Sequence, residues 1–472
     1  MPIIDKSSLQ SNLETLISNI DNSTCIKDIL LSADAHHRIS ENFSTGVLYT
    51  CELPSTTSSC VACGHLIFVD EVNKHLVAGP FGWYDLNGTL VRQDADMHEV
   101  YGWGINSILP TQYFSSGNPA VSPIQEVEGF KNWIKISNTV NGAGIIGDID
   151  NQCGDLYWWG KYGGGAIAYS DNGFAAFQPV KVDTGFSDWT DVSIGECVGV
   201  ALRANGTVWT WGLNNYGQLG INSSGYYTSK SSPVSVVGGF TDWCQVSTSA
   251  QGCHVAAVRA NGTLWTWGRN CADGRLGNNS NYNQSSPVSV VGGFTDWCQV
   301  SAGSYHTAAV RANGTLWTWG RESYGRLGNN EGGPYTAKSS PVSVVGGFTD
   351  WCQVSAGSYH TAAVRENGTL WTWGRNHQGQ LGDETVYCRS SPVSVVGGFT
   401  DWCQVSVSDW HHNVALRSNG TAWSWGNNNF AQLGDGTKYG QSSPVSVVGR
   451  FTDWCQVSAG PFKSSGIRIV SN

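Results

Sequence analysis

The chain has 472 residues with a formal net charge of −10, and it is rich in glycine and tryptophan. The negative balance argues against general binding to nucleic acid, which needs clustered lysine and arginine. No apolar run approaches the roughly 20 residues that span a bilayer, and the first residues do not follow the pattern of a secretory signal peptide. We therefore expect no membrane insertion, and the abundant glycine and tryptophan suit many short strands and turns.

Residues 1–40 are predicted to form amphipathic helices. The stretch SSLQSNLETLISNI places five apolar residues on one helical face, namely Leu9, Leu13, Leu16, Ile17 and Ile20. CIKDILLSADAHH has the pattern of a second short helix. Two short helices bury little surface by themselves, so we expect this region to be an attachment segment that packs on another chain.

Residues 41–96 are predicted to form a small antiparallel β module. GVLYTCELP, GHLIFVDE and KHLVAGPFGWYDLNGTLVR read as short strands that end in an Asn-Gly hairpin. Within this region Cys60, Cys63 and His65 supply half of a zinc-ligand pattern, but no second ligand pair follows at a suitable spacing. We therefore favour a plain strand and turn here and expect no metal.

The remainder of the chain is repetitive. SSPVSVVGGFTDWCQVS occurs at 231–247, 285–301, 339–355 and 390–406, and a fifth copy at 442–458 differs only by an arginine. Two marks, a Trp-Gly pair and the Trp of Phe-x-Asp/Asn-Trp, each recur seven times at steps of 51 to 56 residues. A repeat of about this length is typical of propellers and solenoids.

Each repeat is predicted to contain four strands, which we call a to d in chain order. In one repeat they are 297–303, 306–311, 315–320 and 340–345. Asn313-Gly314 between strands b and c predicts a two-residue hairpin turn with positive φ at both positions. Asn-Gly-Thr also matches the N-glycosylation pattern, but the turn already explains it. Tandem four-stranded units describe a β-propeller.

The two ends of the repeat region complement each other. The chain finishes with strands a and b of a unit, and the first unit, from about residue 97, supplies only strands c and d. Together they complete one blade and close the ring without edge strands. The predicted fold is therefore all-β: a seven-bladed β-propeller of four-stranded blades over 97–472, closed by its N- and C-terminal strands and preceded by the helical and β modules.

These repeats resemble a known family. VRANGTLWTWGRN, followed by Gly-x-Leu-Gly and SAGxxHTAAV, is similar to the regulator of chromosome condensation repeat, which implies a seven-bladed propeller. The founding member is a nucleotide exchange factor that binds chromatin, but this chain lacks a wedge-like inserted hairpin and a basic tail. For histidines at the start of strand b, the resemblance implies a structural hydrogen bond rather than a metal ring; we assign His254, His306, His360 and His411 to this position.

One face of the predicted propeller is a candidate binding surface. Strands alternate in direction, so the a–b and c–d loops emerge together, and they vary between blades while the b–c and d–a loops hardly change. Variable loops on a constant scaffold are typical of binding sites. Aromatic rings among Asn, Ser and Gly suit macromolecular or sugar contacts, although rings that merely cover their own loops remain an alternative. The candidates are Tyr226, Tyr227, Tyr282, Tyr305, Tyr335, Tyr359, Tyr387, Trp410, Tyr439 and Phe462.

Five of the 14 cysteines occupy one repeat position, beside the Trp of Asp-Trp-Cys. Equivalent positions in different blades are expected to lie too far apart for disulfides, so we predict small buried hydrophobes there. This fits assembly in a reducing cytoplasm. The five cysteines are Cys244, Cys298, Cys352, Cys403 and Cys455.

The order of modules suggests a function. GVLYxxxxLP, GxLIFVxE and WYxLxGxLVR ahead of these repeats are similar to predicted virion proteins of tailed bacteriophages. The prediction is a non-enzymatic virion structural protein, a tail-fibre, appendage or decoration subunit. Residues 1–95 would join it to other virion proteins as an oligomer in the particle, and its loop face would meet a host-surface glycan, a receptor or a neighbouring subunit.

Other functions remain open. We find no catalytic triad, phosphate loop or paired carboxylates, and expect no cofactor. The alternative function is an intracellular propeller adaptor that mediates protein–protein interaction. A nucleotide exchange factor or a glycan-active enzyme is less favoured.

Overall fold

A computed structural model describes residues 65–69, 74–79, 82–85, 96–104, 119–125, 132–138, 142–147, 153–160, 176–249, 251–333 and 336–471. The chain divides into two compact units, residues 1–95 and 96–472. Within the described ranges the structure is all-β, and its one helical element is the short 3-10 turn η2 (Tyr226–Thr228). The helices predicted over 1–40 lie outside these ranges.

The described part of the smaller unit is a three-stranded antiparallel sheet. Its strands are β1 (His65–Val69), β2 (Lys74–Gly79) and β3 (Gly82–Asp85), paired in the order β1-β2-β3. They fall inside the region where the sequence predicts a β module. Its expected Asn-Gly hairpin at 87–88, and Cys60 and Cys63, lie outside the described residues.

The larger unit repeats one four-strand pattern. Its first half comprises β4 (Asp96–Gly104), β5 (Ala120–Gln125), β6 (Trp133–Asn138), β7 (Gly142–Gly147), β8 (Gly154–Gly160), β9 (Ala176–Lys181), β10 (Trp189–Ile194), β11 (Val198–Arg203), β12 (Val208–Gly212), β13 (Lys230–Ser235), β14 (Trp243–Thr248), β15 (His254–Arg259), β16 (Leu264–Gly268) and β17 (Gln284–Ser289).

The second half comprises β18 (Trp297–Ala302), β19 (His306–Arg311), β20 (Leu316–Glu322), β21 (Thr336–Ser343), β22 (Trp351–Ala356), β23 (His360–Arg365), β24 (Leu370–Gly374), β25 (Arg389–Ser394), β26 (Trp402–Val407), β27 (His412–Arg417), β28 (Ala422–Gly426), β29 (Gln441–Ser446), β30 (Trp454–Ala459) and β31 (Lys463–Ser471).

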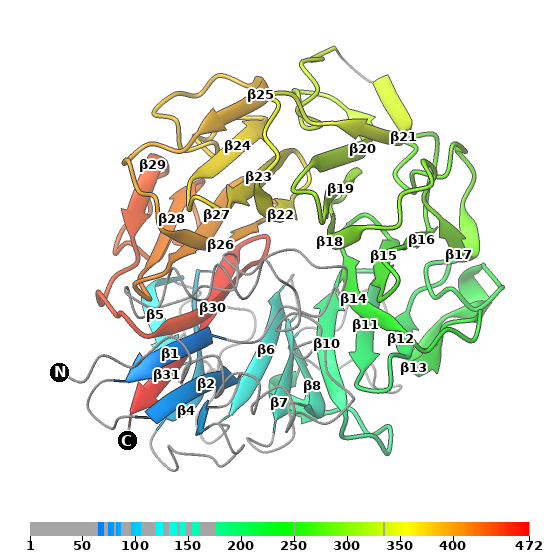
Figure 1. Ribbon diagram of the computed structural model, residues 1–472, viewed down its shortest axis with the longest axis horizontal. Helices are drawn as coiled ribbons and strands as arrows, with labels where there is room; N and C mark the ends of the chain where they lie inside the picture. The colour runs from blue at the N-terminus through cyan, green and yellow to red at the C-terminus, as the bar shows by residue number, and fades with distance from the viewer. Residues whose placement is uncertain are drawn as a thin grey trace, which may run out of the picture. The chain divides into compact units, whose positions relative to one another are not determined.

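These strands form sheets arranged around a centre (Figure 1), in which β6, β10, β14, β18, β22, β26 and β30 are innermost. β14 to β29 make four sheets of four strands, each in chain order, and β6 to β13 make one eight-stranded sheet. The predicted β-propeller is thus confirmed at the level of repeated antiparallel sheets with strand a inside and strand d outside.

The predicted closure of the ring is also confirmed. The last sheet has the order β30-β31-β4-β5, so strands from the two ends of the unit share one blade. β31 pairs with β4 along its whole length, from Lys463 opposite Gly104 to Ser471 opposite Asp96. A closed ring leaves only short outer edges exposed to other chains.

The outer strand d begins earlier than predicted. β21 runs from Thr336 to Ser343, whereas the sequence suggested 340–345. Both the predicted and the observed strand contain Pro341, which has no N–H to donate. Proline is tolerated because strand d is an edge strand whose outer side needs no partner, and the following Val344 turns inward as a buried residue.

The b–c turn differs from the predicted two-residue hairpin. Gly314 has φ 71°, but Asn313 does not have positive φ, and Gly314 N–H donates to Arg311 O at 2.8 Å. This is a type I turn followed by a left-handed glycine, a three-residue loop. A Cβ on Gly314 would lie 2.0 Å from Thr349 O of the d–a loop. Glycine is required there by both conformation and space.

The hydrophobic core lies between successive sheets rather than inside any one of them. One buried cluster joins Val258 and Leu264 of one blade to Trp297, Val300 and Trp319 of the next, and similar clusters recur around the ring. Aliphatic and tryptophan side chains of neighbouring blades therefore hold the ring together by burying apolar surface.

The repeat cysteines are less buried than predicted. Cys298 sits where the register slips between Trp297 and Gln299, so it is the extra residue of a β-bulge. Its thiol donates to Val310 O at 3.4 Å, and the residue is half-buried. Cys403 and Cys455, at the same position, are exposed. Among the described residues none of the five forms a disulfide, and Cys244, Cys298 and Cys352 pack as partly buried residues against the core between the blades.

Candidate binding face

The b–c and d–a loops form one face of the propeller. On this face arginine and aspartate side chains form ion pairs. Arg365 Nε donates to Asp350 Oδ1 at 2.7 Å, and its guanidinium lies 4.0 Å from the ring centroid of Phe348. The same arginine–aspartate–phenylalanine cluster recurs in other blades. This face is nearly identical from blade to blade, as its constant loops predicted.

The opposite face, which we call the loop face, carries the a–b and c–d loops. A buried asparagine organises most of the described c–d loops: Asn376 Oδ1 accepts from Leu381 N–H at 2.8 Å, and its amide donates to Thr385 O at 3.1 Å. Between β20 and β21 a buried glutamate, Glu322, replaces it and accepts from the N–H groups of Gly325 and Leu327. Each loop can therefore vary at its tip while its base stays fixed.

The predicted tyrosines of the c–d loops project into solvent. The exposed fraction of the side chains ranges from 71% to 97% for Tyr226, Tyr227, Tyr282, Tyr387 and Tyr439. Apart from Tyr226 and Tyr227, whose ring centroids are 5.5 Å apart, no ring contact is found for these five among the described residues. They do not cover their own loops. Tyr335 lies outside the described residues.

The predicted aromatics of the a–b loops lie closer to the centre. Tyr305 and Tyr359 are half-buried, with ring centroids 5.8 Å apart although they belong to different blades. Trp410 is 42% exposed and lies 4.8 Å from the half-buried Phe462 of the next blade. The structure thus brings these four together in two pairs and keeps them apart from the outer tyrosines.

The a–b loops converge at the mouth of the central channel. Ser304 and Ser358 both donate to Asp409 Oδ1, at 2.6 and 2.7 Å, although the three residues belong to three different blades. Cys197 and Cys253, from neighbouring a–b loops, form a disulfide with their Cα atoms 5.5 Å apart. Equivalent positions are far apart at the rim of a ring but close at its axis, so our argument against pairing between blades fails here.

The histidines of strand b are structural, as predicted, with one correction. His412 rather than His411 occupies the repeat position, because the loop before β27 has one more residue than those before β19 and β23. His254 Nε2 lies 3.0 Å from Thr307 Oγ1, and that hydroxyl donates to Arg275 O at 2.8 Å. The hydroxyl oxygen therefore accepts from Nε2–H, which fixes the neutral tautomer.

The same contact joins the next blades around the ring. The Nε2 atoms of His306, His360 and His412 each lie 2.8 to 2.9 Å from a side-chain oxygen of the following blade. Burial lowers the pKa of His254 to about 3 and of His360 to about 4. The described residues contain no group of three or more His, Cys, Asp or Glu placed to hold a metal ion.

The extra residue gives His411 a different place. His411 adopts φ 65°, and its ring centroid lies 5.3 Å from that of Tyr359. Its Nδ1 lies 3.2 Å from Gln380 Nε2 on a c–d loop. Burial lowers the pKa of His411 to about 3. His411 thus belongs to the loop face, not to the ring of structural histidines.

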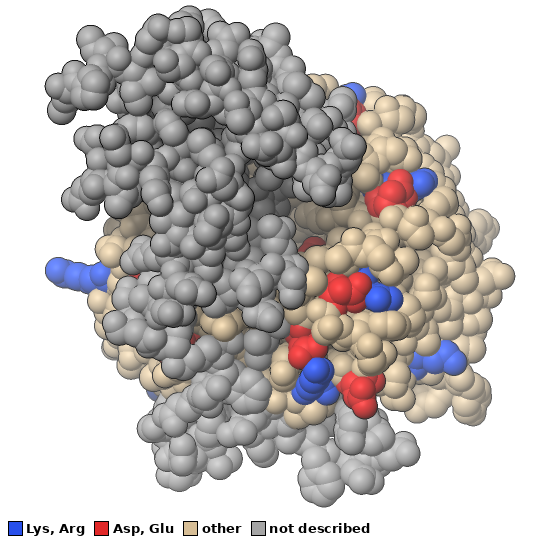
Figure 2. Space-filling model, turned by 60° about the horizontal axis from the view of Figure 1, so that its bottom comes forward, with Lys and Arg blue, Asp and Glu red and all other residues tan. Residues whose placement is uncertain are grey.

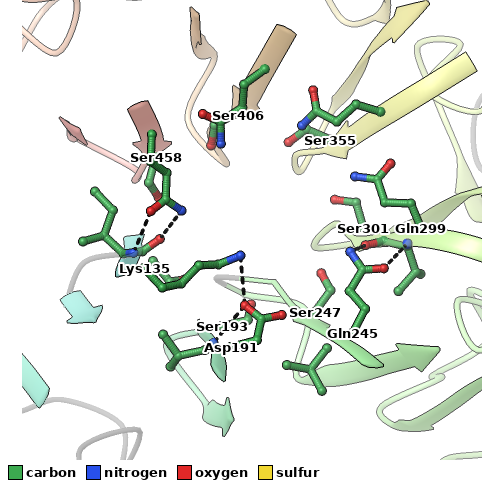
Figure 3. Close-up of a pocket in the computed structure, with 18 of the residues that line it drawn as sticks. Lys135, Asp191, Ser193, Gln245, Ser247, Gln299, Ser301, Ser355, Ser406 and Ser458 are labelled. Carbon is green, nitrogen blue, oxygen red and sulfur yellow. Dashed lines mark hydrogen bonds and ion pairs between the residues drawn. The ribbon is translucent and has the colours of Figure 1, made fainter. Parts of the chain in front are cut away.

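The central channel has a volume of roughly 190 Å³, and polar side chains of the inner strands line it. Figure 3 shows its serines and glutamines around an open centre, with Lys135 reaching Asp191. Gln353 Nε2 donates to Val405 O at 2.9 Å, and its Oε1 accepts from Val405 N–H at 2.8 Å. Each glutamine of the channel pairs in this way with the backbone of the next blade. In the two diverged blades Lys135 and Asp191 stand at the glutamine position and form an ion pair at 2.9 Å instead.

Changing Gln353 to Leu is expected to lower the free energy of unfolding by about 1 to 2 kcal/mol, because two hydrogen bonds to the backbone of Val405 are lost. Denaturant titration measures the change. Gln378→Leu makes the same chemical change at an exposed loop position and should leave stability nearly unaltered. Equal stability of the two variants would show that the hydrogen bonds of Gln353 contribute nothing to the free energy of unfolding.

The sequence reasoning missed a set of arginines on the loop face. Arg269, Arg321 and Arg375 each follow a Trp-Gly pair directly, and they are half-buried beside tyrosines. The repeated Trp-Gly-Arg was visible in the sequence, but attention to the variable loop tips passed over it. Two further arginines, Arg275 and Arg326, lie fully buried beneath them.

Repeated antiparallel sheets around a channel, with one constant and one variable face, define a β-propeller. The chain belongs to the RCC1-like domain family, whose profile matches residues 155–467. This confirms the first resemblance. No helix in the described part of the chain is long and apolar enough to cross a membrane.

Comparisons with known proteins agree. The chain is 31% identical over 306 residues to the mitochondrial RCC1 domain-containing protein RUG3 of Arabidopsis thaliana, covering 62% of this chain and 66% of that protein. It is 32% identical over 321 residues to the ultraviolet-B receptor UVR8 of the same plant, covering 66% and 69%. The match therefore spans about two thirds of the length of these relatives.

Two solved structures share the fold. Human WBSCR16 has a TM-score of 0.68 at 20% identity, over 78% of this chain and 99% of that chain. Prp20p from Saccharomyces cerevisiae has a TM-score of 0.67 at 17% identity, over 80% and 92%. At these identities the likeness concerns the fold alone.

Proposed function

We propose that this protein is a non-enzymatic interaction propeller, an adaptor that binds a protein partner through its loop face. We also propose that the ring has seven blades. The eight-stranded sheet consists of two successive four-strand units, β6 to β9 and β10 to β13, linked through the single pair Trp189–Gly154. With the five other sheets this gives seven units, and seven inner strands line the channel.

The exposure of the c–d tyrosines carries the proposal. Five large amphipathic rings, each at least 71% exposed, stand on loops whose bases are held rigidly by buried hydrogen bonds. Tyrosine on a rigid base binds with little loss of conformational entropy and is enriched at protein interfaces. No such set of rings is found on the described part of the opposite face.

The relatives support an adaptor more than a virion role. They come from plants, fission yeast and mammals, and they include a receptor and an E3 ubiquitin-protein ligase, HERC2. Prp20p of Saccharomyces cerevisiae binds Gsp1p and histones, so a propeller of this fold can bind proteins. The virion role stays a prediction, because the attachment segment on which it rests lies outside the described residues.

The proposal predicts that partner capture depends on the tyrosines. Full-length protein should retain a partner from an extract of its source, and replacing Tyr226, Tyr227, Tyr282, Tyr387 and Tyr439 with Ser should reduce the amount retained at least about tenfold. Quantitative mass spectrometry measures retention, and circular dichroism checks the fold.

The control replaces five exposed threonines of the d–a loops with Ser, namely Thr241, Thr295, Thr349, Thr400 and Thr452. It should bind as the unchanged protein does. Retention that survives the tyrosine changes but is lost when Leu13 and Leu16 become Ser would contradict the adaptor proposal. It would favour attachment through residues 1–95, as a virion subunit requires.

A further inference from the structure

The loop face carries a row of arginines stacked on tyrosines, which we call the Arg–Tyr strip: Arg269, Arg321, Arg375, Tyr216, Tyr305 and Tyr359. Backbone contacts place the arginines. Arg321 N–H donates to Tyr305 O at 2.9 Å, and Arg375 N–H donates to Tyr359 O at 3.0 Å. The residue after each Trp-Gly pair is therefore fixed beside the a–b loop of its own blade.

The guanidinium groups lie over the rings. Arg269 is 4.9 Å from the ring centroid of Tyr216, Arg321 is 5.5 Å from that of Tyr305, and Arg375 is 5.2 Å from that of Tyr359. Stacking engages the flat face of a guanidinium, whereas the N–H groups at its edge are the ones that donate to a planar anion. These contacts hold the side chains ready for such an acceptor.

The strip differs from the opposite face in its charge partners. Arg365 on that face donates to a carboxylate, whereas Arg269 Nε donates to Cys271 Sγ at 3.4 Å and Arg375 Nε to His377 Nδ1 at 3.4 Å. Neither Arg269 nor Arg375 has a carboxylate within ion-pair distance among the described residues. Where charged side chains are visible in Figure 2, by contrast, several acidic and basic groups lie side by side.

Two buried arginines, Arg275 and Arg326, also lie beside a tyrosine of the strip. Arg326 lies 5.4 Å from the ring centroid of Tyr305, and burial lowers its pKa to about 10, so it remains a cation at neutral pH. The acids nearby are already engaged. Asp273 contacts Arg275, and the buried Glu322 accepts from two backbone N–H groups. The Asp409 carboxylate accepts from Ser304 and Ser358.

From this arrangement we infer that the strip binds an acidic peptide segment of a protein partner. The inference rests on the proposed function and names the chemistry of its partner. Guanidinium edges match the paired oxygens of Asp and Glu, and the tyrosine rings offer apolar faces between them. The chain's net charge of −10 works against a long polyanion such as a nucleic acid, so a short acidic segment fits better.

The test is fluorescence anisotropy of the full-length protein with a labelled peptide of alternating Glu and Asp around one Tyr. The matched peptide carries Gln and Asn instead. We expect the acidic peptide to bind and the neutral one not to, with affinity falling as salt rises. Arg375→Ala should weaken binding about tenfold, and Arg269→Ala with Arg375→Ala about a hundredfold.

Lys438→Ala removes a positive charge from an exposed c–d loop of another blade and is the control; it should bind as the unchanged protein does. Equal binding of both peptides, or no effect of the double change, would overturn the inference. Tighter binding of a single-stranded oligonucleotide than of the acidic peptide would do the same. If captured partners depend on the tyrosines but not on these arginines, the inference fails while the proposed function stands.

Discussion

Lowering the pH from about 7.5 to about 5 is expected to reduce the free energy of unfolding by several kcal/mol, because buried histidines must stay neutral. His254, His306, His360 and His412 are fully buried, and each uses Nε2–H to hold the next blade. Protonation of His306 or His360 at Nδ1 would place a second charged donor where no partner is found among the described residues.

The direction follows from the two states. Burial lowers the pKa of His254 and His412 to about 3 and of His360 to about 4, and it lowers that of His306 well below the ordinary value. In the unfolded chain each titrates near its ordinary pKa of about 6.5. As the pH falls below that value the unfolded state binds protons first, so stability present at neutral pH is lost.

At pH 5 each of His254, His360 and His412 costs about 2 kcal/mol by this linkage, and His306 acts in the same direction. Denaturant unfolding across this pH range measures the effect. His360→Gln keeps a donor for Asn413 Oδ1 but does not titrate, so the slope of stability against pH should fall by about one proton. A slope unchanged by this substitution, or stability independent of pH between 7 and 5, would falsify the assignment of buried neutral histidines.

Changing Cys197 to Ser is expected to lower the stability of the oxidised protein by about 4 kcal/mol. The disulfide to Cys253 closes a loop across 56 residues and joins two blades at the axis, and cross-links of this span restrict the unfolded chain by about that much. The unfolding midpoint with and without a thiol reductant measures the change.

Reductant should destabilise the unchanged protein as much as the substitution does and have no further effect on the variant. Cys298→Ser removes a half-buried unpaired thiol and serves as the control. If reductant and the Cys197 substitution both leave the midpoint unaltered, the two blades are held together without this bond.

Repetition made most of the larger unit predictable. Identical segments reveal the blade boundaries, and the complementary chain ends predict that β31 pairs with β4. In the repeat that begins at Trp297, strand b was predicted at its observed bounds, His306–Arg311. Strand d was predicted at 340–345 but begins at Thr336, because the residues before Pro341 pair with strand c of the same blade, and the local pattern does not show this pairing.

The loop face was predictable only in part. Exposed tyrosines follow from variable loops, but the convergence of a–b loops at the axis does not, because it depends on how far each loop lies from the centre of the ring. The Cys197–Cys253 disulfide and the Ser304–Asp409 contact both arise from that convergence. Likewise, the loop before β27 has one additional residue, so His412 and not His411 stands at the repeat position. Two adjacent histidines at nearly the expected spacing hid this shift in the sequence.

The shared blade at the chain ends also determines how the propeller responds to tension. Ser471 stands opposite Asp96, and Lys463 stands opposite Gly104, so the two ends of the unit leave from one end of the same strand pair. A force that separates these ends would open the β4–β31 ladder one rung at a time, like a zipper. Separation of β4 from β31 would then precede the unfolding of every other blade. This strand pair is therefore the mechanical weak point of the ring.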